Sequence, residues 1–304
     1  MEQTRMFPKE KLHVLNNSFM GPAHVIGVFA GIYYLMPKNF QWQFWVFVLV
    51  MFASRAIGIT VGYHRYFTHR SFKCGKVMQA LLAMFGNGAI EGPVISWVAD
   101  HVRHHENTDK EGDPYNAARG FWHSHIGWIL FKDPDRKEDY SAANHLREDP
   151  FTWALVNFQR KYYYALAISL DAVLPMVIAW FLWGNPLAGL IASFIATVLA
   201  WHATFCINSL AHWKHWGSTQ PYSRENTSQD SWIVSLFTFG EGYHNYHHKF
   251  QRDYRNGPLW YNFDPSKWII FWLSNLGLAW DLVRVPDWKI EAARDAVREM
   301  GYRS

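Results

Sequence analysis

Four long apolar segments divide this 304-residue chain into alternating apolar and charged regions. A helix needs about 20 mostly apolar residues to cross the hydrocarbon core of a bilayer. The segments cover residues 20–36, 42–63, 162–183 and 186–213. The second segment contains one charged residue, Arg55, the third contains one, Asp171, and the fourth contains none. Short breaks at 37–39 and 184–186 join them as two hairpins. The sequence therefore predicts an all-α integral membrane protein rather than a soluble helical one.

Lys and Arg residues indicate the orientation, because they are enriched on the cytoplasmic side of membrane proteins. The two short breaks contain one such residue, Lys38. Residues 1–18 contain three, residues 64–161 contain thirteen and residues 214–304 contain eleven. We expect both termini and the two long polar segments to be cytoplasmic. No repeat, linker or second domain is evident, so we expect one membrane domain over 1–304. The net charge of +4, without a basic cluster, does not favour nucleic-acid binding.

Nine of the 16 histidines fall into four closely spaced groups. They are His64 and His69 in HRYFTH; His101, His104 and His105 in HVRHH; His212 in NSLAH; and His244, His247 and His248 in HNYHH. The HxxHH spacing places three imidazoles on one face of a helix. Each group follows a membrane segment or lies in a polar segment expected on the same side. We therefore expect the groups to meet at one depth.

Nine imidazoles exceed the four ligands of one tetrahedral zinc ion, so two metals sharing them is the simplest interpretation. An all-nitrogen ligand set is compatible with iron, copper, nickel or zinc. Two cysteines are too few for a cysteine-rich metal site. Nearby carboxylates could orient the imidazole N–H groups. These are Asp100, Glu106, Asp109, Asp113 and Glu241. The other seven histidines are interpreted as ordinary polar residues, of which His125 is the best candidate for a supporting or head-group contact.

The four histidine motifs resemble those of the membrane-bound fatty acyl desaturases, specifically the stearoyl-CoA (delta-9) branch. Further stretches agree, including Gly58-Ile59-Thr60, Asp113-Pro114, Arg119-Gly120-Phe121 and Gly240-Glu241-Gly242. The resemblance extends from about residue 16 to residue 283. It implies four transmembrane helices under a cytosolic helical cap formed by residues 64–161 and 214–304.

The resemblance also implies a site and a reaction. Two irons would be bound by the nine histidines, with Asn208 reaching one metal through water and with no bound haem. The reaction would use O2 and two electrons to place a cis double bond at carbons nine and ten of a saturated C16–C18 acyl chain. The implied substrate contacts are Asn16, Trp97, Asp100, Arg119 and Thr204. A separate donor, either a ferredoxin or a b-type cytochrome with its reductase, would supply the electrons.

The chain departs from the acyl-CoA enzymes at three places. Ala99 stands where they have an Arg, Glu91-Gly92 where they have Gln-Asn, and Phe205 where they have Trp. The acyl carrier is therefore left open between CoA, acyl carrier protein and a membrane lipid. Two other functions remain alternatives: a histidine-rich di-iron membrane hydroxylase, and a non-catalytic membrane protein that binds metal or haem. The repeated HxxHH triples argue against haem, which needs only two axial ligands.

Overall fold

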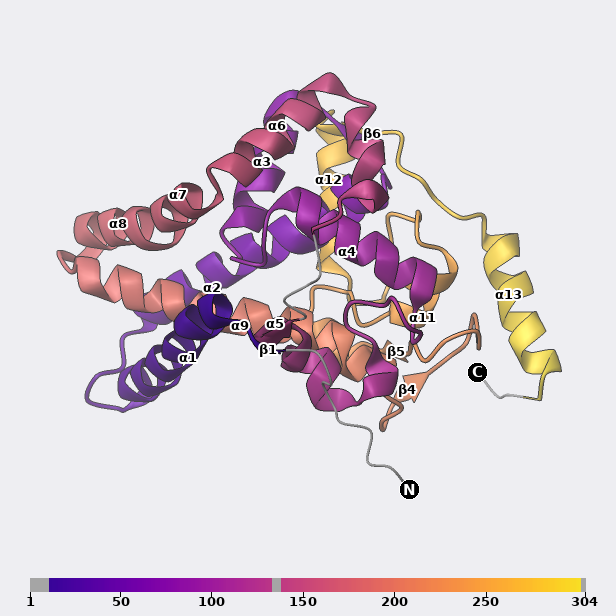
Figure 1. The fold of residues 1–304 in the computed structure, drawn as a ribbon, viewed down its shortest axis with the longest axis horizontal. Coiled ribbons are helices and arrows are strands. Elements are labelled where there is room, and N and C mark those ends of the chain that lie inside the picture. The colour runs from indigo at the N-terminus through magenta and orange to yellow at the C-terminus, as the bar shows by residue number, and fades with distance from the viewer. Residues whose placement is uncertain (1–10, 133–137, 302–304) are drawn as a thin grey trace.

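Four long helical runs extend from one end of the molecule, and the remaining helices gather at the other end (Figure 1). The structure is a computed structural model that describes residues 11–132 and 138–301. The runs are Val14–Leu35, Trp42–Thr68, Tyr163–Trp183 and Pro186–His212. Each is long and apolar enough to cross a membrane. This confirms the four predicted membrane segments and the helical fold class; both chain ends, predicted to be cytoplasmic, lie outside the described residues.

The long runs differ from the predicted segments mainly at the ends that face the other helices. The first begins six residues earlier than predicted, and the second continues to Thr68 instead of ending at Tyr63. They consist of α1 (Val14–Leu35); α2 (Trp42–Ile57) with the π-helix η1 (Gly58–Thr68); α7 (Tyr163–Ile168), η5 (Ser169–Val173) and α8 (Leu174–Trp183); and α9 (Pro186–Asn208) with η6 (Leu210–His212). Hydropathy marked where the apolar sequence ends. The polar residues of η1 are buried by the rest of the protein, so the helix continues beyond the end of the apolar sequence.

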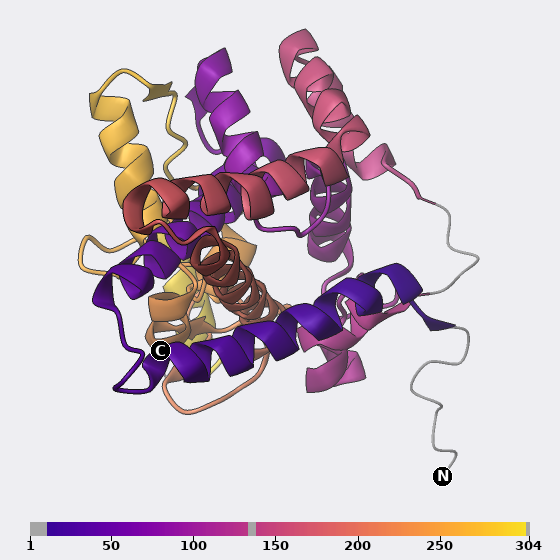
Figure 2. The ribbon, with the colours of Figure 1, turned by 90° about the vertical axis from the view of Figure 1, so that its left-hand side faces the viewer.

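Helix α9 is the centre of the membrane region and packs against α1, α2 and α8. Seen from the side of the long runs, it recedes between α1 and α8 (Figure 2). The preceding helix ends at Gly184, which has a positive φ of 66°. Asn185 then caps α9, because its side-chain oxygen accepts a hydrogen bond from the Ala188 N–H at 3.2 Å. A Cβ at Gly189 would lie 2.1 Å from the Pro175 carbonyl oxygen, so glycine permits the close packing of α8 and α9.

The two charged residues of the predicted membrane segments face each other inside the bundle. The Arg55 guanidinium donates to the Asp171 carboxylate at 2.6 Å and to the Ser193 hydroxyl at 2.7 Å. It also donates to the Gly88 carbonyl at 2.8 Å. Large apolar side chains of these helices are exposed instead, including Phe29, Leu49, Val50, Phe181 and Leu182. This inside-out distribution suits helices surrounded by lipid.

The other end of the molecule is a cap of shorter helices and small sheets. The helices are α3 (Lys76–Asn87), α4 (Val94–Asn107), η2 (Ala117–Arg119), η3 (His123–Gly127), α5 (Trp128–Leu130), η4 (Ser141–Arg147), α6 (Pro150–Lys161), α10 (Trp232–Phe237), α11 (His244–Lys249), α12 (Pro265–Asn275) and α13 (Asp287–Glu299). Antiparallel two-residue strands pair as β1 (Lys11–Leu12) with β3 (Phe131–Lys132), β2 (Lys73–Cys74) with β6 (Ala279–Trp280), and β4 (Ser218–Thr219) with β5 (Asp230–Ser231). The largest apolar core joins η1, α3, α4 and α6, and so fixes the position of α4 within the cap.

Candidate metal centre

All nine histidines singled out by their spacing come together in the cap, in two adjoining groups. The first group is His64, His69, His101, His105 and His247, and the second is His104, His212, His244 and His248. Within each group, the nitrogen atoms that could bind a metal all lie within 4.8 Å of one another. The groups touch, since the ring centroids of His105 and His248 are 4.5 Å apart.

Helices α4 and α11 each contribute to both groups. The three imidazoles of each HxxHH triple point to one side of their helix, as the spacing predicts, but each triple is divided. On α4, His101 and His105 belong to the first group and His104 to the second; on α11, His247 belongs to the first, and His244 and His248 belong to the second. Two facing helices therefore build two adjacent sites with six side chains. His64, which was expected beyond the membrane helix, lies inside η1.

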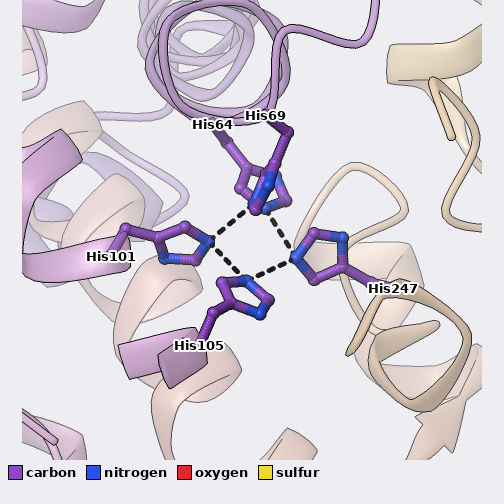
Figure 3. A group of neighbouring side chains, drawn as sticks. All are labelled: His64, His69, His101, His105 and His247. Atoms are coloured by element: carbon purple, nitrogen blue, oxygen red, sulfur yellow. Dashed lines mark hydrogen bonds between the residues drawn. The ribbon is translucent and has the colours of Figure 1, made fainter. Parts of the chain in front are cut away.

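The Nε2 atoms of the first group point toward one central point (Figure 3). The Nε2 of His247 lies 3.0 Å from that of His64 and 2.9 Å from that of His105. The Nε2 of His101 lies 3.1 Å from those of His105 and His69. The five imidazoles come from three separate parts of the chain, so this convergence is a property of the fold and not of one segment.

The second group has the same arrangement. The Nε2 of His248 lies 3.2 Å from that of His104 and 3.1 Å from that of His244. The Nε2 of His212 is buried and has no hydrogen-bond partner in the described part of the chain. A buried nitrogen without a partner is costly in a protein interior, and a bound cation would satisfy it.

Carboxylates hold the opposite edges of two of these rings. Nδ1 of His64 lies 2.8 Å from Oε2 of Glu241. Nδ1 of His104 lies 3.0 Å from Oδ1 of Asp113. An ionised carboxylate can only accept, so each Nδ1 carries the proton and each Nε2 keeps its lone pair for the centre of its group. This carboxylate–histidine arrangement is typical of metal ligands.

The remaining predicted carboxylates lie in different surroundings. Oδ1 of Asp109 is 3.7 Å from Nδ1 of His212, and the same carboxylate binds the Thr227 N–H and hydroxyl. Glu106 is exposed, and Asp100 pairs with Arg103 at 3.5 Å. The expected supporting role is therefore met in geometry by Glu241 and Asp113. Asp109 contacts His212 only through the Thr227 hydroxyl, which lies 3.1 Å from Nδ1 of that ring.

Burial and the neighbouring imidazoles keep most of these histidines neutral. Burial is the largest cause, and it lowers the pKa well below the usual value for His69, His101, His105, His244, His247 and His248. Burial alone would raise the pKa of Glu241, but its contacts with His64 and Arg65 hold that pKa below its usual range. Neutral rings whose lone pairs converge repel one another without a cation between them. The donor set therefore fits two metal ions.

Asn208 is the last residue of α9, and its side chain is buried. His212 follows on the single turn η6, after a change of backbone direction at Ser209. The expectation that Asn208 reaches a metal through water stays a prediction.

A small cavity lies between α2, η1 and α9. Its volume of about 10 Å³ is about the space that one water molecule needs. Its lining is Ala56, Ile59, Thr60, Glu91, Ala200, Ala203, Thr204, Ile207 and Thr238. The Thr60 hydroxyl bonds to the Ser266 hydroxyl and the Thr238 hydroxyl donates to a backbone carbonyl, so these hydroxyls are engaged within the protein. The cavity thus offers a mainly apolar surface.

Glu91 lines this cavity and was not among the predicted site residues. Its carboxylate accepts from the Thr204 hydroxyl at 2.8 Å and from Nε1 of Trp97 at 3.3 Å. The Trp97 ring stacks on His101, with centroids 4.8 Å apart. Thr204 and Trp97 were both predicted as substrate contacts. The available signal for Glu91 was a carboxylate standing alone in an apolar stretch.

Of the five predicted substrate contacts, Thr204 lines the cavity and Trp97 is connected to it through Glu91. The other three lie elsewhere. The Asn16 amide donates to the Ile129 carbonyl at 3.0 Å and so attaches α1 to α5. Arg119 is exposed on η2, and Asp100 lies on α4 beside Arg103. Their role in binding a head group stays a prediction.

Histidines outside the four motifs lie outside both groups. Nδ1 of His125 is 2.9 Å from the Ser209 hydroxyl, and its Nε2 is 3.1 Å from Nδ1 of His202. His145 donates through Nε2 to the Phe67 carbonyl at 2.8 Å. His215 contacts the neighbouring Trp216 carbonyl.

Comparison with known proteins agrees with this geometry. A model of the fatty acid desaturase family matches residues 40–271. The chain is 41% identical to acyl-CoA desaturase 1 of Saccharomyces cerevisiae over 82% of this chain and 48% of that protein. It is 33% identical to stearoyl-CoA desaturase 5 of Bos taurus (92% and 82%) and 31% identical to the delta(9)-fatty-acid desaturase fat-7 of Caenorhabditis elegans (94% and 84%). It spans about half the length of the fungal relatives that it matches. With its four membrane-spanning helices and histidine cluster, the chain belongs to the fatty acid desaturase family.

Proposed function

We propose that this protein is an O2-dependent acyl desaturase that places a cis double bond at carbons nine and ten of a saturated long-chain acyl group. The observation that carries the proposal is the convergence of nine histidines in two groups, which Trp97 and Glu91 connect to an apolar cavity. The printed names of the relatives support the reaction and its position on the chain.

The nine histidines would hold two irons, five rings at one and four at the other. An unactivated C–H bond offers no acidic proton or leaving group to ordinary side chains, so iron and O2 would supply the oxidising power. The protein residues have a positioning role. Glu241 and Asp113 hold the Nδ1 protons of His64 and His104, so that these rings present Nε2.

The cavity would hold the reacting part of the acyl chain. Engaged hydroxyl groups at Thr60, Thr204 and Thr238 leave mainly methyl groups toward the space, which suits methylene groups. Trp97 forms the connection to the histidines, because it stacks on His101. Fixing two chosen carbons against the metal centre is the protein's main contribution to such a reaction.

We further propose coenzyme A as the acyl carrier, because the relatives are named acyl-CoA and stearoyl-CoA desaturases. The chain would act as one membrane domain with its cap and both termini in the cytoplasm. This orientation rests on the concentration of Lys and Arg outside the two short breaks. A separate ferredoxin, or a b-type cytochrome with its reductase, would deliver the electrons.

The decisive test is expression in a host that lacks its own delta-9 desaturase and contains a suitable electron donor. We expect C16 and C18 chains with a cis double bond after carbon nine, located by mass spectrometry of the host lipids. Purified protein with its donor should convert stearoyl-CoA directly. A hydroxylated acyl chain, or no oxidised lipid despite bound iron, would overturn the proposal.

A further inference from the structure

The carboxyl group of Glu91 is an unusual component of a cavity that would receive a saturated chain. It lies in the turn between α3 and α4, where it is partly buried. No ion pair neutralises it in the described part of the chain, and its partners are the neutral donors Thr204 and Trp97. A buried carboxylate without a cation is costly in its charged form.

One hydrogen bond of Glu91 joins it to Thr204, which also lines the cavity, and the other joins it to Trp97 outside the lining. Thr204 lies on α9, a membrane helix, and Trp97 lies on α4, which carries three of the histidines. Bonds to a charged acceptor are stronger than bonds to a neutral one. Ionised Glu91 therefore holds Thr204, and with it α9, more firmly than neutral Glu91 does. Both residues line the cavity, which has room for about one water molecule.

On the basis of the proposed function, we propose that Glu91 is a proton-linked gate on the acyl cavity: its ionised form holds the cavity closed, and its neutral form admits the apolar chain. Entry of the chain removes the remaining water near the carboxyl group. Removal of water disfavours the charged form further, so chain binding and proton uptake favour each other.

The surroundings of Glu91 place this change near neutral pH. Burial raises the pKa of Glu91 to about 7, although hydrogen bonds from Thr204 and Trp97 act in the opposite direction. The nearby titratable groups are the phenols of Tyr63 on η1 and Tyr163 on α7.

Other charged or titratable groups lie beyond the residues that contact Glu91. Arg55 binds the Gly88 carbonyl, and Asp171 balances its charge. His101 lies behind the Trp97 ring. The carboxyl group of Glu91 is therefore the titratable group that lines the cavity itself.

The test measures binding of radiolabelled stearoyl-CoA to the purified, iron-loaded protein without any reductant, so that no turnover occurs. If only neutral Glu91 admits the chain, affinity should fall about tenfold for each pH unit above 7. Glu91→Gln keeps a neutral hydrogen-bonding group of the same shape, so its affinity should change less than about threefold between pH 6 and 9. Glu148→Gln is the matched control, because Glu148 is exposed and pairs with Arg70 at the surface. It should follow the wild-type pH dependence.

Proton uptake gives a second measurement that needs no variant. Binding of stearoyl-CoA to the wild-type protein at pH 8 should take up about one proton per chain, detected with an indicator dye in weakly buffered solution. The same pH dependence in Glu91→Gln as in the wild type, or binding without proton uptake, would overturn the gate. Absence of stearoyl-CoA binding in every variant at every pH would instead overturn the proposed substrate, and the acyl gate with it.

Discussion

The imidazole of His64 and the carboxylate of Glu241 lie 2.8 Å apart, and the same carboxylate accepts a hydrogen bond from Arg65 at 2.9 Å. Arg65 is also paired with Asp264, so the carboxylate that orients His64 is held by a buried charge network. The residue after a candidate ligand thus helps to fix that ligand. Such supporting contacts set the ring orientation and the tautomer of metal-binding histidines.

Glu241→Gln should weaken metal binding without removing it. The amide keeps the size of the side chain but loses the charge that fixes the proton on Nδ1 of His64. Loss of such a partner costs about 10–100-fold in metal affinity. Iron retained per chain, measured by mass spectrometry after dialysis against graded chelator, should fall at correspondingly lower chelator concentrations. Glu225→Gln alters an exposed residue near Lys249 and should match the wild type. Equal retention in both variants would contradict the role of Glu241.

A histidine of the two metal-binding groups and a histidine outside them should respond differently to replacement by alanine. His104→Ala removes a ring of the second group and leaves Asp113 without its partner, so we expect loss of desaturation and iron falling from about two to about one per chain. His145→Ala removes a hydrogen bond to the Phe67 carbonyl, which costs about 1 kcal/mol of stability. Its iron content and activity should remain close to the wild type. An inactive, iron-poor His145→Ala protein would show that the division of the histidines is wrong.

The nine histidines could be predicted from the sequence because helical spacing places residues i, i+3 and i+4 on one face. Their division into two groups could not be predicted from the sequence. That division depends on how α4 and α11 face each other, which no local spacing encodes. Likewise, hydropathy located the second membrane helix but not its continuation through η1, since His64 and Arg65 are buried by contacts with Glu241 from a distant segment. Glu91 was missed for the same reason: only the fold brings Thr204 to it.

The pair formed by Arg55 and Asp171 should be essential to the membrane bundle. Asp171→Asn leaves a buried guanidinium without its counter-charge, and breaking a buried pair in this way costs about 3–5 kcal/mol. Thermal unfolding in detergent should show a clear loss of stability. The double variant Arg55→Leu, Asp171→Leu removes both charges and should recover much of that loss. Glu148→Ala breaks the exposed pair with Arg70 and should cost less than about 1 kcal/mol. Equal losses in the single and double variants would contradict this account.

Asn208 and His212 should respond differently to replacement by alanine. Asn208 is the last residue of α9, and its side chain is buried. His212 follows on η6, and its buried Nε2 has no hydrogen-bond partner among the described residues. A neutral amide is a weak direct ligand, whereas imidazole binds metals well. Asn208→Ala should therefore keep close to two irons per chain and lose most of its activity, since it would remove the group that we expect to orient water near one metal. His212→Ala should lose iron as well as activity.

Asn157→Ala provides the control for the asparagine substitution. Asn157 is a partly buried asparagine on α6, and its amide donates to the Trp153 carbonyl at 2.7 Å, away from both histidine groups. Its removal should leave iron content unchanged and activity within about twofold, because one such hydrogen bond contributes about 1 kcal/mol to stability and nothing to the centre. Measuring both the iron content and the turnover of stearoyl-CoA distinguishes a role in orienting water from a role in packing or in binding metal. Full activity in Asn208→Ala would assign this residue to helix packing, and loss of both irons would make it a direct contributor to metal binding.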